Sequence, residues 1–399
     1  MNSSAEKEPA EAGTISANSA PEVLENLVRL AERAGASDIH LQMRGKSAEV
    51  GFRLDGIITP GRELPAEIAD RVFGRIKFLA RLKTYQETLP QDGRISHDEL
   101  KSKNDIRVAT YPTVTGEKIV LRLFNSETAK TLGELGLPAA ANAELEKFLR
   151  QTTGLLLLTG PAGSGKTTTI YACLRHLAEL GGRHIITVED PVEQIVSGTM
   201  QTEVNEAIGL DFARAARHLL RQDPQVLIIG EIRDEATAQL AVRAGLTGHL
   251  VISTLHAGSC KGVFERLLAM CADHSAVASA VELVLNQRLI RKVCSACAGS
   301  GCESCLHTGY CGRVPLVEWL RVDQAVVARA SCLCVSEKEI PPTATHRQDA
   351  CATTKTLREQ IRQRELSAIA PLQTLEASAR LLVKQGVTNE TEFKRVFGI

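Results

Sequence analysis

The sequence lacks the features of a secreted or membrane-spanning protein. No apolar run approaches the roughly 18 to 20 residues that a transmembrane helix needs, and residues 1–20 contain acidic side chains and no apolar segment typical of a signal peptide. Positive charge is not in excess, because 47 Lys and Arg residues balance 47 Asp and Glu residues, which disfavours a surface built to bind nucleic acid. Aromatic residues make up only 4%, so we expect a core of Leu, Ile, Val and Ala in a cytoplasmic protein.

The length of 399 residues predicts two or three domains. Residues 1–20 are rich in Ser, Ala and Glu and are expected to form a disordered tail. Residues 21–125 are expected to form a small α+β domain, with a helix from Pro21 to Gly35 and a tight turn at Asp55-Gly56. Its other predicted elements are a helix over 66–82 and strands over 48–54, 105–111 and 117–124. Residues 126–137 are polar, contain two glycines and precede Pro138, which is typical of a linker.

Residues 138–399 are expected to form a second, larger α/β domain. Helices alternate there with apolar strands, a pattern typical of a parallel sheet that helices cover on both faces. The expected strands are 155–159, 184–188, 225–229 and 249–254. The polar residues 331–356 are expected to form an irregular insertion. A helix is expected between Pro371 and Gly386, because Leu372, Leu375, Ala379 and Leu382 share one helical stripe.

A phosphate-binding loop is the strongest motif in the chain. Residues 160–167, GPAGSGKT, match G-x-x-x-x-G-K-[ST], with an apolar strand before them and a predicted helix after them. The glycines let backbone N–H groups point at a phosphate, Lys166 would reach the β- and γ-phosphates, and the Thr167 hydroxyl would hold Mg²⁺. A chance glycine-rich turn is the alternative. The predicted ATP-binding residues are Gly160, Gly163, Ser164, Gly165, Lys166, Thr167 and Thr168.

Three further segments place polar residues beside apolar strands. The strand over 185–189 ends in Glu189 and Asp190, and the strand over 226–229 leads to Glu231, which would lie beside Mg²⁺ or the attacking water. His249 and His256 bracket a third strand, and His256 follows its end, where a sensor of the γ-phosphate would lie. Solvated acidic turns and structural histidines are the alternatives. We expect Glu231, Glu189, His256 and His249 to act in catalysis.

These four segments resemble, in order, the Walker A motif, aspartate box, modified Walker B motif and histidine box of the secretion ATPase superfamily. The chain is similar to the ATPases of type II secretion and type IV pilus assembly from about residue 23 to its C-terminus. Further similar segments are ASDIH at 36–40, FRLDG at 52–56, PQDGR at 90–94 and GEKIVLR at 116–122. The resemblance implies a RecA-like phosphate-loop ATPase core with a small α+β N-terminal domain.

The resemblance also implies that arginines of the N-terminal domain reach the phosphates of a nucleotide between the two domains. By position, the candidates are Arg107 and Arg122. Arg122 lies between Val120 and Phe124, on a strand face where we expect apolar residues, so it needs a partner. A triphosphate would provide one. A salt bridge with a local acidic residue is the alternative.

Four of the 11 cysteines fall into two C-x-x-C pairs, Cys294 with Cys297 and Cys302 with Cys305. Four thiolates suit tetrahedral Zn²⁺, and free thiols or a redox pair are the alternative. The resemblance agrees, because secretion and pilus-extension ATPases have a tetracysteine metal module here, which retraction ATPases lack. In those ATPases a Thr-Gly-Tyr-x-Gly-Arg stretch follows, as in residues 308–313 of this chain. We therefore expect a structural zinc subdomain over residues 294–313 of the ATPase domain.

The function implied by the resemblance is that of a cytoplasmic homo-hexamer that hydrolyses ATP with Mg²⁺ to drive assembly of a type II secretion pseudopilus or a type IV pilus. Its partners would be an inner-membrane platform protein and associated components at the cytoplasmic face, so it would be peripheral at the inner membrane, without a specific nucleic acid. A DNA-transport motor of the same superfamily is an alternative, disfavoured by the neutral charge and few aromatics. A ring subunit that binds nucleotide without hydrolysis is another, disfavoured by the intact Lys166, Thr167, Glu189 and Glu231.

Overall fold

The computed structural model describes residues 19–123, 130–322 and 356–398. The chain divides into two compact units, Met1–Thr128 with Arg291–Arg313, and Ala129–Ile290 with Val314–Ile399. The predicted tail lies outside the described residues except for Ser19 and Ala20, and so does the predicted insertion except for Thr356. Among the described helices, none has both the length and the apolar character required to cross a membrane.

The first unit is built on a six-stranded sheet in the order β3-β2-β1-β6-β5-β4. Its neighbouring strands pair antiparallel throughout. Its elements are α1 (Ala20–Ala34), β1 (Asp38–Arg44), β2 (Ser47–Leu54), β3 (Ile57–Leu64), α2 (Ala66–Leu79), β4 (Gln91–Ile95), α3 (His97–Leu100), β5 (Ile106–Thr113), β6 (Gly116–Leu123) and η3 (Glu303–Cys305).

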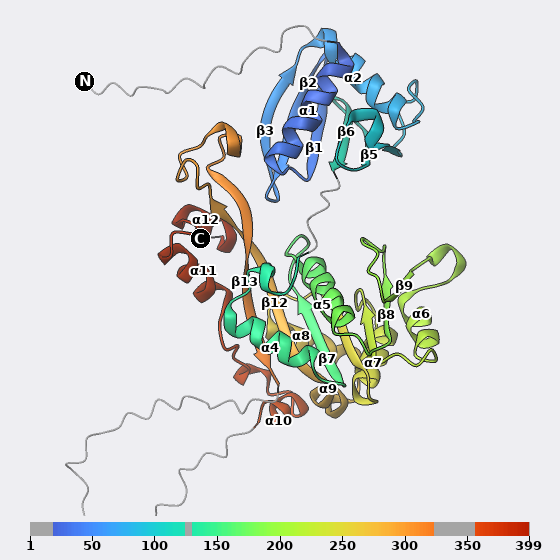
Figure 1. Cartoon of the computed structure of the whole chain (residues 1–399), viewed down its shortest axis with the longest axis vertical. Coiled ribbons are helices and arrows are strands. Elements are labelled where there is room, and N and C mark those ends of the chain that lie inside the picture. The colour runs from blue at the N-terminus through green and yellow to red at the C-terminus, as the bar shows by residue number, and fades with distance from the viewer. Residues whose placement is uncertain (1–18, 124–129, 323–355, 399) are drawn as a thin grey trace, which may run out of the picture. The chain divides into compact units, whose positions relative to one another are not determined.

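Helices α1 and α2 lie along this sheet (Figure 1). The apolar stripe of α1, which includes Leu24 and Leu27, and the alternate residues Ile39 and Leu41 of β1 are buried in one core. Gly35 ends α1 with φ 70°, and Asp55 and Gly56 form the β2–β3 turn with φ 50° and 88°. The predicted helix from Pro21 and the predicted hairpin are therefore observed.

The second unit contains a seven-stranded sheet in the order β13-β12-β7-β11-β10-β8-β9, and β12, β7, β11, β10, β8 and β9 pair in parallel. Its elements up to β11 are η1 (Gly133–Leu135), α4 (Ala139–Leu149), β7 (Gly154–Thr159), α5 (Lys166–Leu180), β8 (Ile185–Glu189), β9 (Met200–Glu203), η2 (Glu206–Ile208), α6 (Phe212–Leu219), β10 (Val226–Ile229), α7 (Glu235–Leu246) and β11 (Leu250–Thr254). The later elements are α8 (Cys260–Met270), α9 (His274–Ala280), β12 (Val281–Val293), β13 (Tyr310–Arg321), α10 (Leu357–Arg362), η4 (Leu366–Ala368), α11 (Leu375–Lys384) and α12 (Glu390–Phe397).

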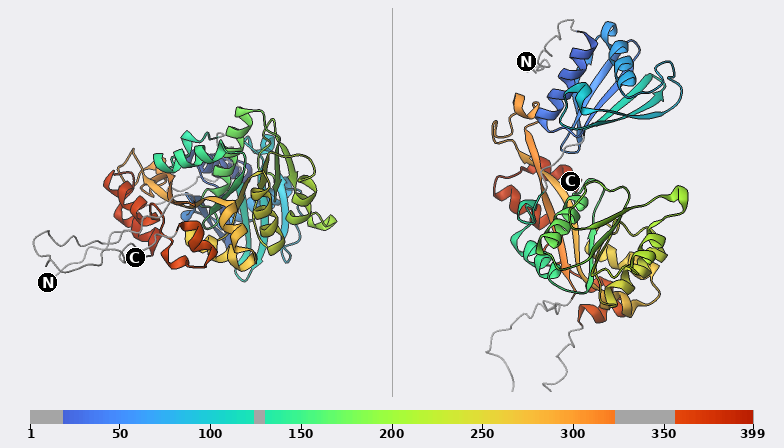
Figure 2. Two further views of the ribbon diagram at one scale, coloured as in Figure 1. Left: turned by 90° about the horizontal axis from the view of Figure 1, so that it is seen from below. Right: turned by 45° about the vertical axis from the view of Figure 1, so that its right-hand side comes forward.

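Helices cover both faces of this sheet (Figure 2). Strand residues alternate between two cores: Leu155 and Leu157 pack with α6 to α10, whereas Leu156 and Leu158 pack with α4 and α5. A strand buried on both faces is apolar at every position, which explains the uninterrupted Leu155–Leu158 run. The expected α/β core is thus confirmed.

The long strands β12 and β13 were not predicted, and the division between the units falls within both of them. Helices α11 and α12 pack on this strand pair around Ile290 and Leu316. The helix predicted from Pro371 begins later, at Leu375, because the Thr374 side chain accepts a hydrogen bond from the Ala377 N–H. Leu372 is outside the helix, and its N–H donates to the Trp319 carbonyl oxygen.

The cysteine segment belongs to the first unit, whereas the sequence led us to expect residues 294–313 within the ATPase domain. The Gly312 N–H donates to Asp55 Oδ2 at 2.8 Å, and Arg313 pairs with Asp55 Oδ1 at 3.5 Å. Leu306 packs against the core of the first unit. These long-range contacts, which local sequence patterns do not reveal, attach the segment to the β2–β3 turn.

Candidate functional site: a phosphate loop bordered by two carboxylate motifs

The phosphate loop connects β7 to α5, and its glycines adopt conformations that side chains disfavour. Gly160, Gly163 and Gly165 have φ values of 136°, 72° and 91°. A Cβ on Gly160 would lie 2.2 Å from the Gln287 carbonyl oxygen. The loop therefore requires glycine at Gly160 for close approach as well as for its backbone conformation.

Lys166 folds back over this loop. Its Nζ donates to the carbonyl oxygens of Gly160 and Pro161, each at 2.9 Å. Burial lowers the pKa of Lys166, and the nearby Glu231 opposes that shift. The buried Ser164 hydroxyl has no hydrogen-bond partner within the described parts of the chain. An unsatisfied donor beside a lysine and a helix N-terminus fits a phosphate ligand.

Glu189 ends β8 as a buried carboxylate with three side-chain donors. Tyr171 on α5 donates to Oε2, and Thr187 donates to Oε1. The Gln201 amide on β9 also donates to Oε1, at 3.0 Å. Burial, and then the hydrogen bond to Glu189, raise the pKa of Tyr171 to about 12. The phenol therefore stays protonated at neutral pH and can serve as a donor.

Glu231 lies beyond the end of β10 and is held by cationic and imidazole side chains. Arg233 bonds to Glu231 Oε1 and to Asp190 Oδ2, the latter at 3.2 Å. His256 Nε2 lies 3.4 Å from Glu231 Oε2. The hydrogen bond with Glu231 is the main reason that the pKa of Arg233 is raised. Arg233 therefore connects the two acidic motifs.

A cavity of about 210 Å³ brings these groups together. Its lining includes Lys166, Thr167, Glu189, Glu231 and His256. They meet because β7, β8, β10 and β11 are parallel neighbours, so their C-terminal ends share one edge of the sheet. The arrangement combines a phosphate cradle, a lysine and carboxylates that could position a cation or water.

Within the second unit, His249 lies away from this cavity. It precedes β11, whereas His256 follows it, and a strand of this length spans roughly 16 Å. His249 Nδ1 lies 3.2 Å from the Ala244 carbonyl oxygen. Of the residues predicted to bind nucleotide, Lys166 and Thr167 line the cavity, whereas Gly160, Gly163, Ser164, Gly165 and Thr168 do not.

Arg107 and Arg122 belong to the first unit, where they are directly paired across β5 and β6. Arg122 was expected on the apolar face of β6, and this expectation was wrong, because Leu121 and Leu123 face the core while the Arg122 side chain is 66% exposed. Arg122 Nε donates to Asp38 Oδ1 at 3.0 Å, so the alternative of a local salt bridge is observed.

Two residues of the site were not singled out from the sequence. Arg233 lies within the Gly230–Asp234 motif but received no role. Tyr171 lies five residues beyond Lys166 on the same helix, and the need of a buried phenol for a polar partner could have identified it.

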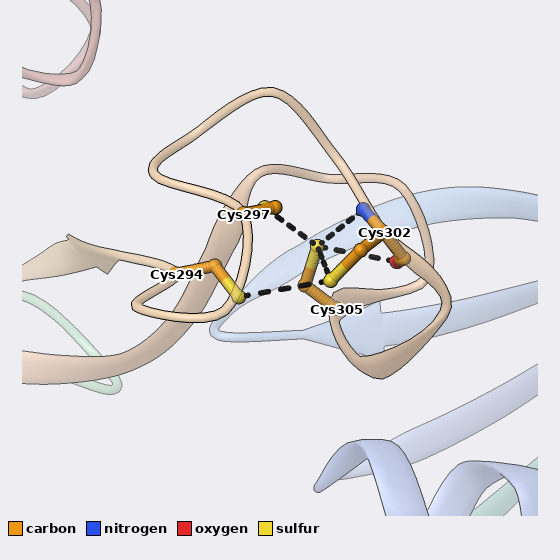
Figure 3. Close-up of side chains that lie close together, drawn as sticks. All are labelled: Cys294, Cys297, Cys302 and Cys305. Atoms are coloured by element: carbon orange, nitrogen blue, oxygen red, sulfur yellow. Dashed lines mark hydrogen bonds between the residues drawn. The ribbon is translucent and has the colours of Figure 1, made fainter.

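The four predicted cysteines converge in the first unit (Figure 3). Cys294 and Cys302 have sulfurs 3.9 Å apart, as do Cys297 and Cys305, and all four lie within 4.8 Å of one another. Sulfurs at Zn–S bonds of about 2.3 Å lie about 3.8 Å apart in a tetrahedral site. The cluster therefore fits a tetrahedral metal ion.

Backbone donors favour thiolates at Cys297 and Cys305, whereas burial raises the pKa of Cys294 to about 11. The Gly301 N–H donates to Cys297 Sγ at 3.2 Å, and the Gly309 N–H donates to Cys305 Sγ at 3.3 Å. Burial would raise the pKa of Cys305, but hydrogen bonds from the backbone of Cys302 and Gly309 lower it to about 6. Thiolates are the form that binds a metal.

The sequence profile of the family described as "Type II/IV secretion system protein" matches residues 15–377. The chain is 40% identical over 313 residues to "Putative type II secretion system protein E" of Escherichia coli strain K12, covering 72% of this chain and 63% of that protein. It is 36% identical over 326 residues to "Type IV pilus assembly ATPase TfpB" of Acinetobacter baylyi, covering 74% of this chain and 56% of that protein. The chain thus spans less than two thirds of these relatives' length.

Two solved structures share the fold. The ATPase DotB of Legionella pneumophila has a TM-score of 0.67 at 19% identity, with 97% of this chain and 98% of that chain covered. The pilus retraction motor PilT, solved with bound ADP, has a TM-score of 0.60 at 24% identity, with 93% and 96% covered.

Proposed function

Because the chain belongs to the Type II/IV secretion system protein family, we propose that it is an ATPase that drives assembly of a type II secretion pseudopilus or a type IV pilus. The observation that most supports this proposal is the cavity in which Lys166, Thr167, Glu189, Glu231 and His256 meet. A phosphate cradle with two carboxylates suits phosphoryl transfer, which depends on positioning and on neutralising charge.

In this proposal, the backbone N–H groups of Gly163 to Thr168 surround the phosphates of ATP. Lys166 leaves the carbonyl oxygens of Gly160 and Pro161 to contact the β- and γ-phosphates. Thr167 would hold Mg²⁺, which neutralises phosphate charge when bound. His256 senses the γ-phosphate through its contact with Glu231. His249, at the far end of β11, would pass the presence or absence of this phosphate on to the rest of the ring.

Glu231 is proposed to polarise the attacking water or to hold Mg²⁺ through water. Its carboxylate lines the cavity with Lys166 and His256 and contacts the side chains of Arg233 and His256, whereas the Glu189 carboxylate accepts hydrogen bonds from three side chains. Glu189 is the alternative general base. If Glu231 is the base, Glu231→Gln should lower kcat by about 100-fold or more while ATP still binds. A comparable loss in Glu189→Gln alone would assign the base to Glu189.

Arg107 and Arg122 are proposed to contact the phosphates during turnover. In the salt bridge with Asp38 the Arg122 side chain is exposed, so Arg122 can leave Asp38 for a phosphate with only a small loss of free energy. Arg122→Ala is expected to lower kcat for ATP hydrolysis, whereas a purely structural role would lower only the free energy of unfolding of the first unit.

The four cysteines are proposed to hold a structural Zn²⁺, which cross-links the two knuckles when bound. The active assembly would be a homo-hexamer peripheral at the cytoplasmic face of the inner membrane. There it would act on a membrane platform protein and associated secretion or pilus components, without a specific nucleic acid.

Turnover of ATP by the purified chain tests the proposal. Phosphate release should require Mg²⁺ and fall to background in Lys166→Ala. Lys147→Ala, which removes an exposed lysine on α4, is the matched control and should retain full activity. Phosphate release that is no greater in the wild type than in Lys166→Ala would sink the enzyme proposal.

A further inference from the structure

We propose that Tyr171 is a positioning residue for the ATPase reaction, whose hydroxyl fixes Glu189 and the chain that follows it against the phosphate-loop helix. The inference rests on the proposed function and adds a residue outside the four sequence boxes. Tyr171 lies on α5, the helix that begins with Lys166.

The Tyr171 hydroxyl makes contacts to two separate parts of the aspartate-box region. It donates to Glu189 Oε2. It accepts from the backbone N–H groups of Glu193 at 2.9 Å and Gln194 at 3.2 Å. One donor and two acceptor contacts use the full hydrogen-bonding capacity of a phenol, so no bond can be lost without leaving a polar group unsatisfied.

The segment over residues 191–199 is otherwise held by a few contacts: Arg175 on α5 donates to the Gln194 side chain, Glu203 accepts from the Val192 N–H, and Val196 is buried. Most of its side chains are exposed, including Ile195 at 93%. Gln201 provides a second polar link, because its amide donates to Glu189 Oε1 and to the Gln194 carbonyl oxygen. Tyr171 and Gln201 therefore bond to different oxygens of the same carboxylate and both bond to the same segment.

Tyr171 links the aspartate-box region to the phosphate loop through helix α5. Tyr171, Lys166 and Thr167 share one helix, so a shift of α5 on nucleotide binding moves the phenol together with the loop. Asp190 follows Glu189 directly and bonds to Arg233, which bonds to Glu231. The phenol thus sets the position of both acidic motifs relative to the phosphates, a requirement that catalysis by positioning imposes.

Tyr171→Phe isolates this role, because phenylalanine keeps the buried ring and removes only the hydroxyl. We expect kcat for ATP hydrolysis to fall on the order of 10-fold, as for the loss of one hydrogen bond to a charged group. The Kd for the fluorescent analogue mant-ATP with Mg²⁺ should stay within about twofold of wild type, since the phosphate cradle is unchanged. Amide exchange in residues 191–199 should become faster than in wild type.

Tyr85→Phe is the matched control, because Tyr85 is 81% exposed and outside the site, and it should leave all three quantities unchanged. A Tyr171→Phe variant with wild-type kcat overturns the inference, as does one in which Kd rises in proportion to the loss of kcat. A variant that loses kcat only together with a large fall in melting temperature also overturns it, since the hydroxyl would then serve folding alone. These outcomes differ from failure of the proposed function, in which the wild type itself releases no phosphate above Lys166→Ala.

Discussion

At the scale of single residues, the first unit contains a buried ion pair. Lys77 Nζ on α2 lies 2.8 Å from Glu117 Oε2 on β6, and their side chains are 2% and 7% exposed. Lys77 also donates to the Gln86 carbonyl oxygen at 3.2 Å. Burial raises the pKa of Glu117 even though the pairing with Lys77 opposes that shift. Removing one partner of such a pair leaves a buried charge unpaired.

Lys77→Met is therefore expected to lower the free energy of unfolding of the first unit by about 3–5 kcal/mol at neutral pH. Protonation removes the unpaired charge of Glu117, so this deficit should be smaller at pH 5 than at pH 8. Chemical denaturation followed by circular dichroism measures both values. The double variant Lys77→Met, Glu117→Gln is the control and should be more stable than the single variant; equal stability would contradict the prediction.

Asp38 gives a second pH-dependent prediction, at lower pH, because its pKa is shifted in the opposite direction from that of Glu117. Burial would raise its pKa, but hydrogen bonds from Arg122 and Ser37 and the charge of Arg53 lower it overall. A carboxylate with a lowered folded-state pKa stabilises the fold above its unfolded pKa of about 3.9, and this contribution disappears as the pH falls through the folded-state value.

Asp38→Asn should accordingly lower the free energy of unfolding by about 1–3 kcal/mol at pH 7. The difference from wild type should shrink as the pH falls below about 4, because the unfolded chain then binds the proton first, and it should vanish below the folded-state pKa, where folded Asp38 is neutral as well. Denaturant titrations over this pH range measure the difference. A deficit that stays constant down to the acid transition would rule out the proposed charge contribution.

At the scale of secondary-structure elements, the cysteine knuckles have little apolar core of their own. Leu306 is the residue that packs on the core of the first unit, and the two knuckle loops touch so closely that a Cβ on Gly309 would lie 2.4 Å from the Gly299 carbonyl oxygen. We therefore propose that a bound metal, together with the Asp55 contacts, would order this segment.

Removing the metal with a chelator, or replacing Cys297 with Ser, is expected to destabilise residues 294–309 by at least about 3 kcal/mol. Amide exchange over this segment and the zinc content of the purified chain provide the measurement. Cys311→Ser is the matched control, because Cys311 is exposed and outside the cluster. Asp55→Ala should speed exchange without loss of zinc, whereas unchanged zinc content in Cys297→Ser would refute the four-thiolate site.

At the scale of the whole molecule, the proposed mechanism requires neighbouring copies of the chain, because a ring converts hydrolysis in one subunit into motion of the next. ATPase activity per subunit is therefore expected to rise steeply with protein concentration and to level off once hexamers form. Light scattering at the same concentrations gives the mass of the assembly. Constant activity per subunit across a range in which the mass falls to that of a monomer would contradict the ring mechanism.

The sequence alone determined the parts of this protein that depend on neighbours along the chain. The phosphate loop, the strand ends at Glu189 and Glu231, the Gly35 helix end and the two C-x-x-C pairs each require a local backbone conformation or ligand spacing, and short motifs record such requirements. Apolar strands between helices likewise predicted the α/β core, since a parallel sheet buries both faces of its central strands.

The tertiary structure decided what depends on residues far apart in the chain. The parallel sheet placed His256 at the cavity and His249 at the far end of β11, and the sheet of the first unit turned Arg122 toward Asp38. The contacts of Asp55 assigned the cysteine segment to the first unit, and the fold brought Tyr171 to Glu189. Hydrogen bonds and ion pairs of this kind form only when packing has fixed the register and orientation of separate elements, so a local pattern can indicate that Arg122 or Tyr171 needs a partner but cannot identify the partner.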